Sequence, residues 1–251
     1  MPPPATPTPG TPVPAKTVPV SEVLVRGEMT VHGRIAGSSN ATLLVTCTLD
    51  GAELLAVYKP ARGERPLWDF PGGLHRREVA AYRLSEALGW GLVPETVERE
   101  VAPFGPGSVQ RLVPDDGRSH YFTLREDARW APTLVTLATF DVLANNADRK
   151  SGHVLLADGR LWAIDHGLTF HEEPKLRTVI WDFAGERLPN RVQDDLERWL
   201  AEGLGEQQLA GLLDDRELEA LDRRTRALLD AGELPAPDED REWPPYPWPL
   251  V

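Results

Sequence analysis

The sequence predicts an α+β fold with two lobes: a small, mainly β N-terminal lobe with one key helix, and a larger, mainly helical C-terminal lobe that carries a hairpin. Short apolar runs separated by glycine fill residues 29–58 and are typical of strands. Leucines at i, i+4 spacing amid alternating charge fill residues 192–229 and are typical of helices. A polar stretch at residues 114–118 separates the two patterns. We therefore expect an N-lobe over residues 21–113 and a C-lobe over residues 114–234.

Composition excludes several classes of protein. A chain of 251 residues with 41% hydrophobic residues can bury a substantial core. We expect a cytoplasmic protein without a transmembrane segment, because no run of about 18 apolar residues occurs and the start does not resemble a signal peptide. The net charge of −12 argues against a nucleic-acid binder. The single cysteine, Cys47, rules out an internal disulfide and is expected to be a buried thiol.

Prolines gather at both ends of the chain. Residues 1–20 combine proline with little apolar bulk, which predicts a disordered or polyproline leader. Residues 235–251 join an acidic run to Trp243, Tyr246 and Trp248. We expect these aromatic rings to pack on the body of the protein, although a protein partner that binds proline-rich segments is an alternative.

The N-lobe pattern contains a candidate phosphate-binding turn. Residues 23–25 fit a strand or a first helical turn, and residues 29–35, 43–47 and 54–58 fit strands. The turn between the first two strands can place backbone N–H groups around a phosphate, because small residues let the chain approach closely. An ordinary hairpin turn is the competing interpretation. The turn residues are Gly37, Ser38, Ser39 and Asn40.

Lys59 follows the third strand, where its ammonium group could point into a cleft. A loop rich in glycine and proline then leads to a helix that we expect over residues 76–88, with Glu78 near its start. A lysine on a strand and a glutamate on the next helix can pair, and the pair can orient the ammonium group toward the phosphates of a nucleotide.

Strand-like segments at residues 96–101 and 108–113 complete the N-lobe, and an apolar helix pattern from residue 132 leads the chain to residues 145–167. That stretch holds Asp148 and Asp165, joined by two short apolar runs around Asp158-Gly159, a strong hairpin signal. The two carboxylates should therefore lie near each other, where they suit a divalent metal and a phosphate ester. A surface hairpin with solvated aspartates is the alternative. We expect Asp141, in the preceding helix, to be structural.

The order of these residues resembles that of the phosphatidylinositol 3/4-kinase branch of the protein-kinase-like superfamily, and most of all the type II phosphatidylinositol 4-kinases. It is also similar to uncharacterised actinobacterial kinase-related proteins. The resemblance covers residues 29–183 and implies a two-lobed protein-kinase-like fold. The matching segments are residues 57–60, 77–82, 146–149 and 163–168.

The resemblance also implies the roles of individual residues. Lys59 would bind the phosphates of ATP, with Glu78 as its partner, and the turn of Gly37 to Asn40 would cover the triphosphate. Asp148, with Arg149 beside it, would act on an unidentified hydroxyl acceptor, and Asp165 would bind Mg²⁺ or Mn²⁺. The adenine would meet the segment between the lobes, formed by Gln110, Arg111, Leu112 and Val113.

One position departs from the family. Related kinases place an Asn or Asp five residues after the catalytic aspartate as a second metal ligand, and here that residue is His153. A neutral imidazole is a poorer ligand for Mg²⁺ than an oxygen and suits Mn²⁺ or Zn²⁺ better. His153 could instead pack at the start of the strand, and Asn145 or Asn146 could supply an oxygen.

Three functional hypotheses follow. The leading one is an ATP- and metal-dependent phosphotransferase, for which a protein or small-molecule hydroxyl is at least as good an acceptor as a lipid because no dense basic cluster is present. The second is a nucleotide-binding pseudokinase that regulates a protein partner through the proline-rich ends. The third is an interaction protein that keeps the fold without a nucleotide.

Overall fold

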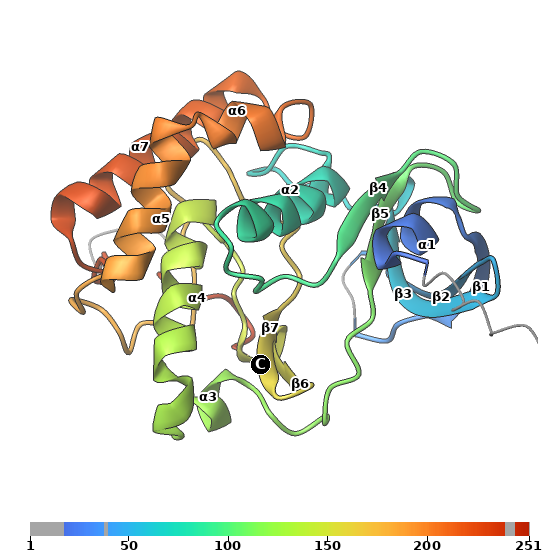
Figure 1. Cartoon of the computed structure of the whole chain (residues 1–251), viewed down its shortest axis with the longest axis horizontal. Coiled ribbons are helices and arrows are strands. Elements are labelled where there is room, and N and C mark those ends of the chain that lie inside the picture. The colour runs from blue at the N-terminus through green and yellow to red at the C-terminus, as the bar shows by residue number, and fades with distance from the viewer. Residues whose placement is uncertain (1–17, 38–39, 239–243, 251) are drawn as a thin grey trace, which may run out of the picture.

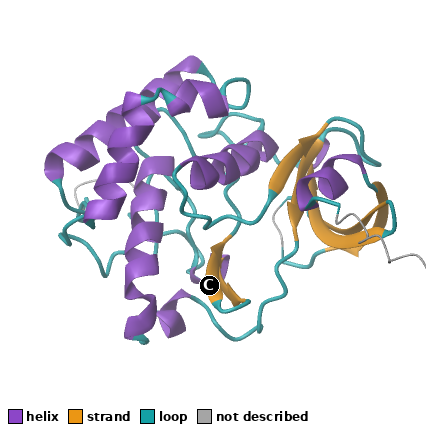
Figure 2. Ribbon diagram, viewed as in Figure 1, coloured by secondary structure: helices purple, strands orange, loops and turns teal. Residues whose placement is uncertain are grey.

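The computed structural model describes residues 18–37, 40–238 and 244–250. Residues 1–17 of the leader expected over residues 1–20 lie outside the described residues, whereas Val20 begins a helix. Figure 1 shows two lobes side by side, with five strands in one and most of the helices in the other. The colouring of Figure 2 shows the same separation of strands from helices. The expected two-lobed α+β architecture is confirmed. Within the described part of the chain, no helix has both the length and the apolar character needed to cross a membrane.

The N-lobe is built on one antiparallel sheet with the strand order β1-β2-β3-β5-β4. Consecutive strands pair as hairpins from β1 to β3, and β5 then inserts between β3 and β4. The strands are β1 (Glu28–Arg34), β2 (Leu43–Leu49), β3 (Ala52–Pro60), β4 (Thr96–Arg99) and β5 (Gly107–Arg111).

Two helices pack against this sheet. The segment expected as a strand or a helical turn is helix α1 (Val20–Arg26), which buries Val23 and Leu24 among sheet residues that include Tyr58 and the buried Cys47. Helix α2 (Leu74–Ala87) packs on β4 and β5. Because side chains alternate along a strand, β3 sends Tyr58 toward α1 and Lys59 toward α2.

The C-lobe core runs from α2 to the last helix. Leu84 and Leu88 are buried in one apolar cluster with Phe140 and Leu221, so α2 is anchored in both lobes. This anchoring fixes the helix that carries Glu78 relative to the C-lobe. The C-lobe helices are α3 (Tyr121–Leu124), α4 (Ala131–Ala144), α5 (Asn190–Ala201), α6 (Leu204–Leu209) and α7 (Asp215–Ala231).

The expected hairpin is confirmed. Strands β6 (Val154–Ala157) and β7 (Arg160–Ala163) pair in antiparallel register around Asp158 and Gly159, whose φ angles are 53° and 71°. Two successive residues with positive φ form the turn that matches strand twist, and Asp-Gly is a preferred pair for it.

The C-terminal segment lies beside this hairpin (Figure 1). The N–H of Thr178 donates to the carbonyl of Pro245 at 3.0 Å, and the N–H of Ser151 donates to the carbonyl of Leu250 at 2.8 Å. The aromatic side chains do not follow the expectation that they pack on the body, since Trp248 is 88% exposed and Tyr246 is 47% exposed. The segment is held by its backbone instead. Trp243 lies outside the described residues.

Candidate active site

Three charged side chains from distant parts of the chain meet between the lobes. The ammonium group of Lys59 on β3 bonds Oε1 of Glu78 on α2 and, at 2.9 Å, Oδ1 of Asp165 after β7. The second carboxylate oxygen of Glu78 accepts the backbone N–H of His166 at 3.0 Å. Glu78 therefore holds the lysine and the Asp165 segment together.

The backbone at Asp165 is shaped for this contact. Asp165 has a φ of 60°, a left-handed conformation that few residues other than Gly, Asn and Asp adopt. The turn brings Gly167 so close that an added Cβ would lie 3.4 Å from Oε1 of Glu78. Non-glycine residues with positive φ gather at functional sites, because surrounding contacts must hold them there.

Lys59 and Asp165 hold each other in their charged forms. The positive charge of Lys59 keeps the pKa of Asp165 well below its usual range, although burial acts in the opposite direction. Burial acts to lower the pKa of Lys59, but Asp165 and Glu78 together raise it above the ordinary value. The side chain of Asp165 is 49% exposed, so an ionised carboxylate is open to a cation at this point.

Asp148 lies in the loop between α4 and β6. Its Oδ2 bonds the ammonium group of Lys150 at 2.5 Å, and its backbone N–H donates to Oδ1 of Asn146 at 3.0 Å. Burial raises the pKa of Asp148 above its usual value, and the charge of Asp165 adds to this effect, while Lys150 opposes it. The influence of Asp165 agrees with the expectation that the two carboxylates lie near each other.

Lys150 is the residue that sequence reasoning missed. It has an extended backbone and follows Asp148 by two residues, a spacing that points two side chains to the same side of the chain. That spacing is the available signal, and it is weak because most lysines are solvated.

Arg149 lies beneath the loop. Its side chain is fully buried, forms an ion pair with Asp141 at 3.0 Å, and donates to the carbonyls of His153 and Ile164 at 3.3 and 2.9 Å. Nη2 also lies 2.7 Å from Nε2 of His166. The expectation of a catalytic Arg149 is therefore corrected to a positioning role, because these contacts turn its guanidinium inward. The structural role expected for Asp141 is confirmed.

Asn145 and Asn146, which could supply a metal with a ligand oxygen, are both buried, and the side-chain oxygen of each accepts a backbone N–H. Oδ1 of Asn145 accepts the N–H of Lys175 at 2.8 Å. Oδ1 of Asn146 accepts the N–H of Asp148, and its amide nitrogen donates to Asp141 at 2.9 Å. Both amides shape the loop, so neither provides a free oxygen.

His153 lies next to Asp165, with Nε2 at 3.4 Å from Oδ2. Burial lowers the pKa of His153 to about 4, so the ring is neutral near pH 7. Because Nδ1 accepts the N–H of Lys150 at 3.4 Å, the proton of the neutral ring sits on Nε2. In this tautomer His153 presents an N–H to Asp165, and it would have to change tautomer to coordinate a metal through Nε2.

The turn expected to cover the triphosphate is only partly described. Gly37 has a φ of 82°, which suits a tight turn, and Oδ1 of Asn40 accepts the N–H of Arg65 at 2.9 Å. Ser38 and Ser39 lie outside the described residues.

The segment expected to meet the adenine joins β5 to the C-lobe. The side chain of Gln110 is buried and donates to Thr96 at 2.8 Å, and Arg111 binds Glu95 at 2.6 Å. After Arg111 the chain leaves the sheet, and Val113 packs with Trp162 on β7. These side chains are engaged with the protein, so contact with a ligand would come from the backbone.

The described residues contain no group of three or more His, Cys, Asp or Glu side chains arranged to hold a metal ion. Within the described site, Asp165 is the more exposed of the two aspartates and is ionised, as a metal ligand must be. A metal at this site would take its remaining ligands from the phosphates of a nucleotide and from water, as Mg²⁺ often does.

Comparison with known proteins identifies one relative. Protein Rv2133c of Mycobacterium tuberculosis is 41% identical over an alignment 265 residues long, gaps included, and the alignment covers 90% of this chain and 94% of that protein. The chain belongs to the family of Rv2133c. No family model matches the sequence.

Solved structures define the fold. The Golgi casein kinase superposes with a TM-score of 0.56 at 18% identity, over 84% of this chain and 72% of that one. A second structure of this kinase, with Mn/ADP bound, gives 0.54 at 17% identity, over 84% and 74% of the two chains. Hydra Fam20 with sugar gives 0.55 at 16% identity, over 84% and 86%. The expected protein-kinase-like fold is confirmed, and the resemblance to the phosphatidylinositol 3/4-kinase branch stays a prediction.

Proposed function

We propose that this protein is an ATP- and divalent-metal-dependent kinase-like phosphotransferase that acts on a hydroxyl group. The observation that carries the proposal is the bonding of one ammonium group, Lys59, to both Glu78 and Asp165. The three residues come from two lobes. Such a cluster can bind the phosphates of a nucleotide and the metal that accompanies them. The kinase-like fold supports this assignment.

Nucleotide binding would use the groups that join the lobes. Lys59 would donate to the phosphates while Glu78 keeps it in place. The turn of Gly37 to Asn40 would cover the triphosphate, and the backbone of Gln110 to Val113 would meet the adenine. These contacts would position the nucleotide for transfer, and such positioning can contribute a large part of the rate enhancement of phosphoryl transfer.

Asp148 would accept the proton of the attacking hydroxyl. Its raised pKa suits a base, because proton transfer is most effective when the pKa of the base approaches the working pH. Lys150, bonded to Asp148, would face the same region and offer a positive charge to the phosphoryl group during transfer.

Asp165 would hold the metal, which supplies charge neutralisation to the phosphates when bound. The donor set suits Mg²⁺ or Mn²⁺, because one ionised carboxylate leaves several positions for phosphate and water. The Golgi casein kinase has been solved with Mn/ADP, and Mn²⁺ is a reasonable first choice for assays here as well.

A protein or small-molecule hydroxyl is our preferred acceptor. The phosphatidylinositol kinase resemblance would require groups for an inositol phosphate, and the arginines near the start of α2 are already paired. Arg77 is buried against Glu217, and Arg76 lies 3.3 Å from Glu98. A lipid acceptor is less well supported, because these arginines are paired within the protein. Assays should still include a lipid.

A nucleotide-binding pseudokinase is the second candidate. It is favoured by one observation: the second metal position holds His153, whose Nε2 carries the proton toward Asp165. In that case ATP would bind without transfer, and the protein would act on a partner.

One experiment separates the two functions. ATP affinity is measured by calorimetry, and phosphate transfer to protein, small-molecule and lipid hydroxyls is measured with Mg²⁺ and with Mn²⁺. The kinase proposal expects metal-dependent binding and transfer, with metal-dependent ATP affinity lost in Asp165→Asn and kept in Asp194→Asn, a change on the exposed side of α5. Binding without transfer would favour the pseudokinase. The absence of any ATP binding would contradict both.

A further inference from the structure

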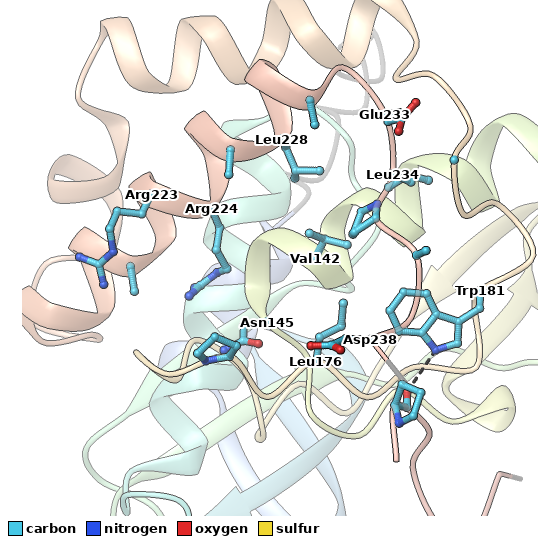
Figure 3. Close-up of a pocket in the computed structure, with 18 of the residues that line it drawn as sticks. Val142, Asn145, Leu176, Trp181, Arg223, Arg224, Leu228, Glu233, Leu234 and Asp238 are labelled. Atoms are coloured by element: carbon cyan, nitrogen blue, oxygen red, sulfur yellow. Dashed lines mark hydrogen bonds between the residues drawn. The ribbon is translucent and has the colours of Figure 1, made fainter. Parts of the chain in front are cut away.

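A cavity of about 730 Å³ opens in the C-lobe, between α4, α7 and the chain that follows α7 (Figure 3). Cavities of this size hold ligands of drug or fatty-acid dimensions. None of the residues assigned above to nucleotide, metal or acceptor lines it. Its walls are mainly apolar. They include Val142, Leu176, Trp181, Ala227, Leu228 and Leu234.

Arg224 on α7, a partly buried cation, lies at the side of this cavity. Figure 3 shows its side chain reaching from α7 toward Asn145. Nε donates to the carbonyl of Leu143 at 2.8 Å, and Nη1 donates to the carbonyl of His171 at 3.3 Å. Nη2 is buried and has no hydrogen-bond partner among the residues that the structure describes.

The charge of Arg224 is not balanced by a direct ion pair. Its two partners are neutral carbonyls, and no carboxylate in the described ranges forms a salt bridge with it. Burial lowers its pKa to about 10, so the group still carries its charge near pH 7. Glu217 attracts this charge without forming a salt bridge with it, and the buried Nη2 atom has no direct partner. A buried polar group without a partner is costly, and an anion that enters beside Nη2 would relieve that cost.

The rim of the cavity restricts the kind of anion. Three exposed acids, Glu172, Glu233 and Asp238, and one exposed cation, Arg223, lie at the rim, so the rim carries more negative than positive charge. This excess of negative charge disfavours a highly charged anion such as a nucleotide or an inositol phosphate. A single carboxylate on an apolar body satisfies both the buried guanidinium and the apolar walls.

We propose that this cavity is a binding site for a small apolar carboxylic acid, held by its carboxylate at Arg224 and by its hydrocarbon body against the walls formed by α4, α7 and Trp181. The proposal is independent of the phosphotransferase function, because it uses none of the residues between the lobes.

Calorimetric titration of the full chain with decanoate tests the proposal, with decanol as the uncharged probe of equal length. Decanoate should bind at least about tenfold more tightly than decanol, as expected for a hydrogen bond to a charged group. Arg224→Gln should remove that preference, whereas Arg226→Gln, a change of the same kind on the same helix outside the cavity lining, should keep it. Ala227→Phe places a ring at the cavity wall and should weaken both probes about tenfold or more.

Three results would overturn the proposal: no binding of decanoate, equal binding of decanoate and decanol, or unchanged affinity in Ala227→Phe. Circular dichroism and thermal melting check that each variant folds. If Arg224→Gln does not fold, the proposal can still be tested. The affinities of decanoate and decanol are then compared for the unmodified protein and for Ala227→Phe, and neither measurement requires Arg224→Gln.

Discussion

The candidate active site contains two aspartates whose surroundings act in opposite directions. Asp165 is half exposed and touches Lys59, and this cation holds the pKa of its carboxylate well below the usual range. Asp148 is more buried, and its burial raises its pKa even though Lys150 is bonded to it. When the surroundings separate the pKa values of two neighbouring acids in this way, the acids can take separate roles. Asp165 is suited to hold a cation and Asp148 to accept a proton.

The first prediction concerns Asp148 and tests whether it acts as the base. Asp148→Asn keeps the size of the side chain and removes the base, so kcat should fall by about 10²–10⁴-fold. Affinity for ATP should stay within about twofold, because Asp148 is not assigned to nucleotide binding. Steady-state kinetics and calorimetry measure the two effects. A variant with near-normal kcat would show that Asp148 is not the base.

The second prediction concerns Lys59, the cation that contacts Asp165 and Glu78. Lys59→Met should abolish transfer and should lower the free energy of unfolding by about 3 kcal/mol, because it leaves Glu78 buried without its partner. Chemical denaturation measures the loss. The double variant Lys59→Met/Glu78→Gln should recover much of that stability, since no unpaired charge remains buried. Asp165 also loses Lys59, but its side chain is half exposed and water can solvate it. Equal stability of the single and double variants would argue that the ion pair contributes little.

The third prediction uses pH to distinguish the two acids. A base works only when it is deprotonated, and burial raises the pKa of Asp148. The acid limb of kcat should therefore lie above the pKa of an ordinary aspartate, about 4, and activity should fall about tenfold per pH unit below it. Asp165 should stay ionised throughout, because its pKa is lowered. The limb should persist in His153→Asn, which separates Asp148 from the imidazole. If the acid limb disappears in His153→Asn, the titrating group is His153 and not Asp148.

The fourth prediction concerns the metal. His153→Asn replaces the N–H that faces Asp165 with a group that can offer an oxygen to a hard cation. The ratio of activity with Mg²⁺ to activity with Mn²⁺ should rise by roughly tenfold, the size of effect typical of changes around a metal site. Metal titrations of the two proteins give this ratio, and an unchanged ratio would mean that His153 has no part in metal selection.

The smallest expected effect comes from the C-terminal segment. Deletion of residues 236–251 removes the bonds that Pro245 and Leu250 accept from Thr178, Trp181 and Ser151. Each such bond contributes about 1 kcal/mol, and a loss of about 3 kcal/mol in a chain of this size should lower the melting temperature by roughly 6–12 °C. Trp248→Ala should change it by much less, because the ring is exposed. If the point variant matched the deletion, the ring and not the backbone would hold the segment.

Much of the fold could be predicted from local patterns. The strands of the N-lobe, the hairpin at Asp158-Gly159 and the late helices each show a regular spacing of apolar residues or a turn signal. The pairing of Lys59 with Glu78 was also accessible, because one residue lies on a strand and the other on the next helix. These features depend on neighbours in sequence, which is what a pattern records.

The missed features depend on individual hydrogen bonds and ion pairs, which the spacing of residue types does not record. The inward turn of Arg149 requires Asp141 on α4 and the carbonyl of Ile164 after β7, and nothing near Arg149 in sequence shows either contact. The tautomer of His153 follows from a single N–H of Lys150. Aromatic content wrongly suggested that the tail is held by its rings, because the backbone carbonyls that hold it have no sequence signature.

The bond from Ser151 to Leu250 has a consequence for protein synthesis. Ribosomes build the chain from its N-terminus, and domains begin to fold before synthesis ends. The loop that carries Asp148 is therefore made long before the carbonyl of Leu250 exists to accept the N–H of Ser151. A nascent chain can assemble the paired cluster of Lys59, Glu78 and Asp165 while this loop still lacks one of its supports. The site would then be completed only when Leu250 has left the ribosome.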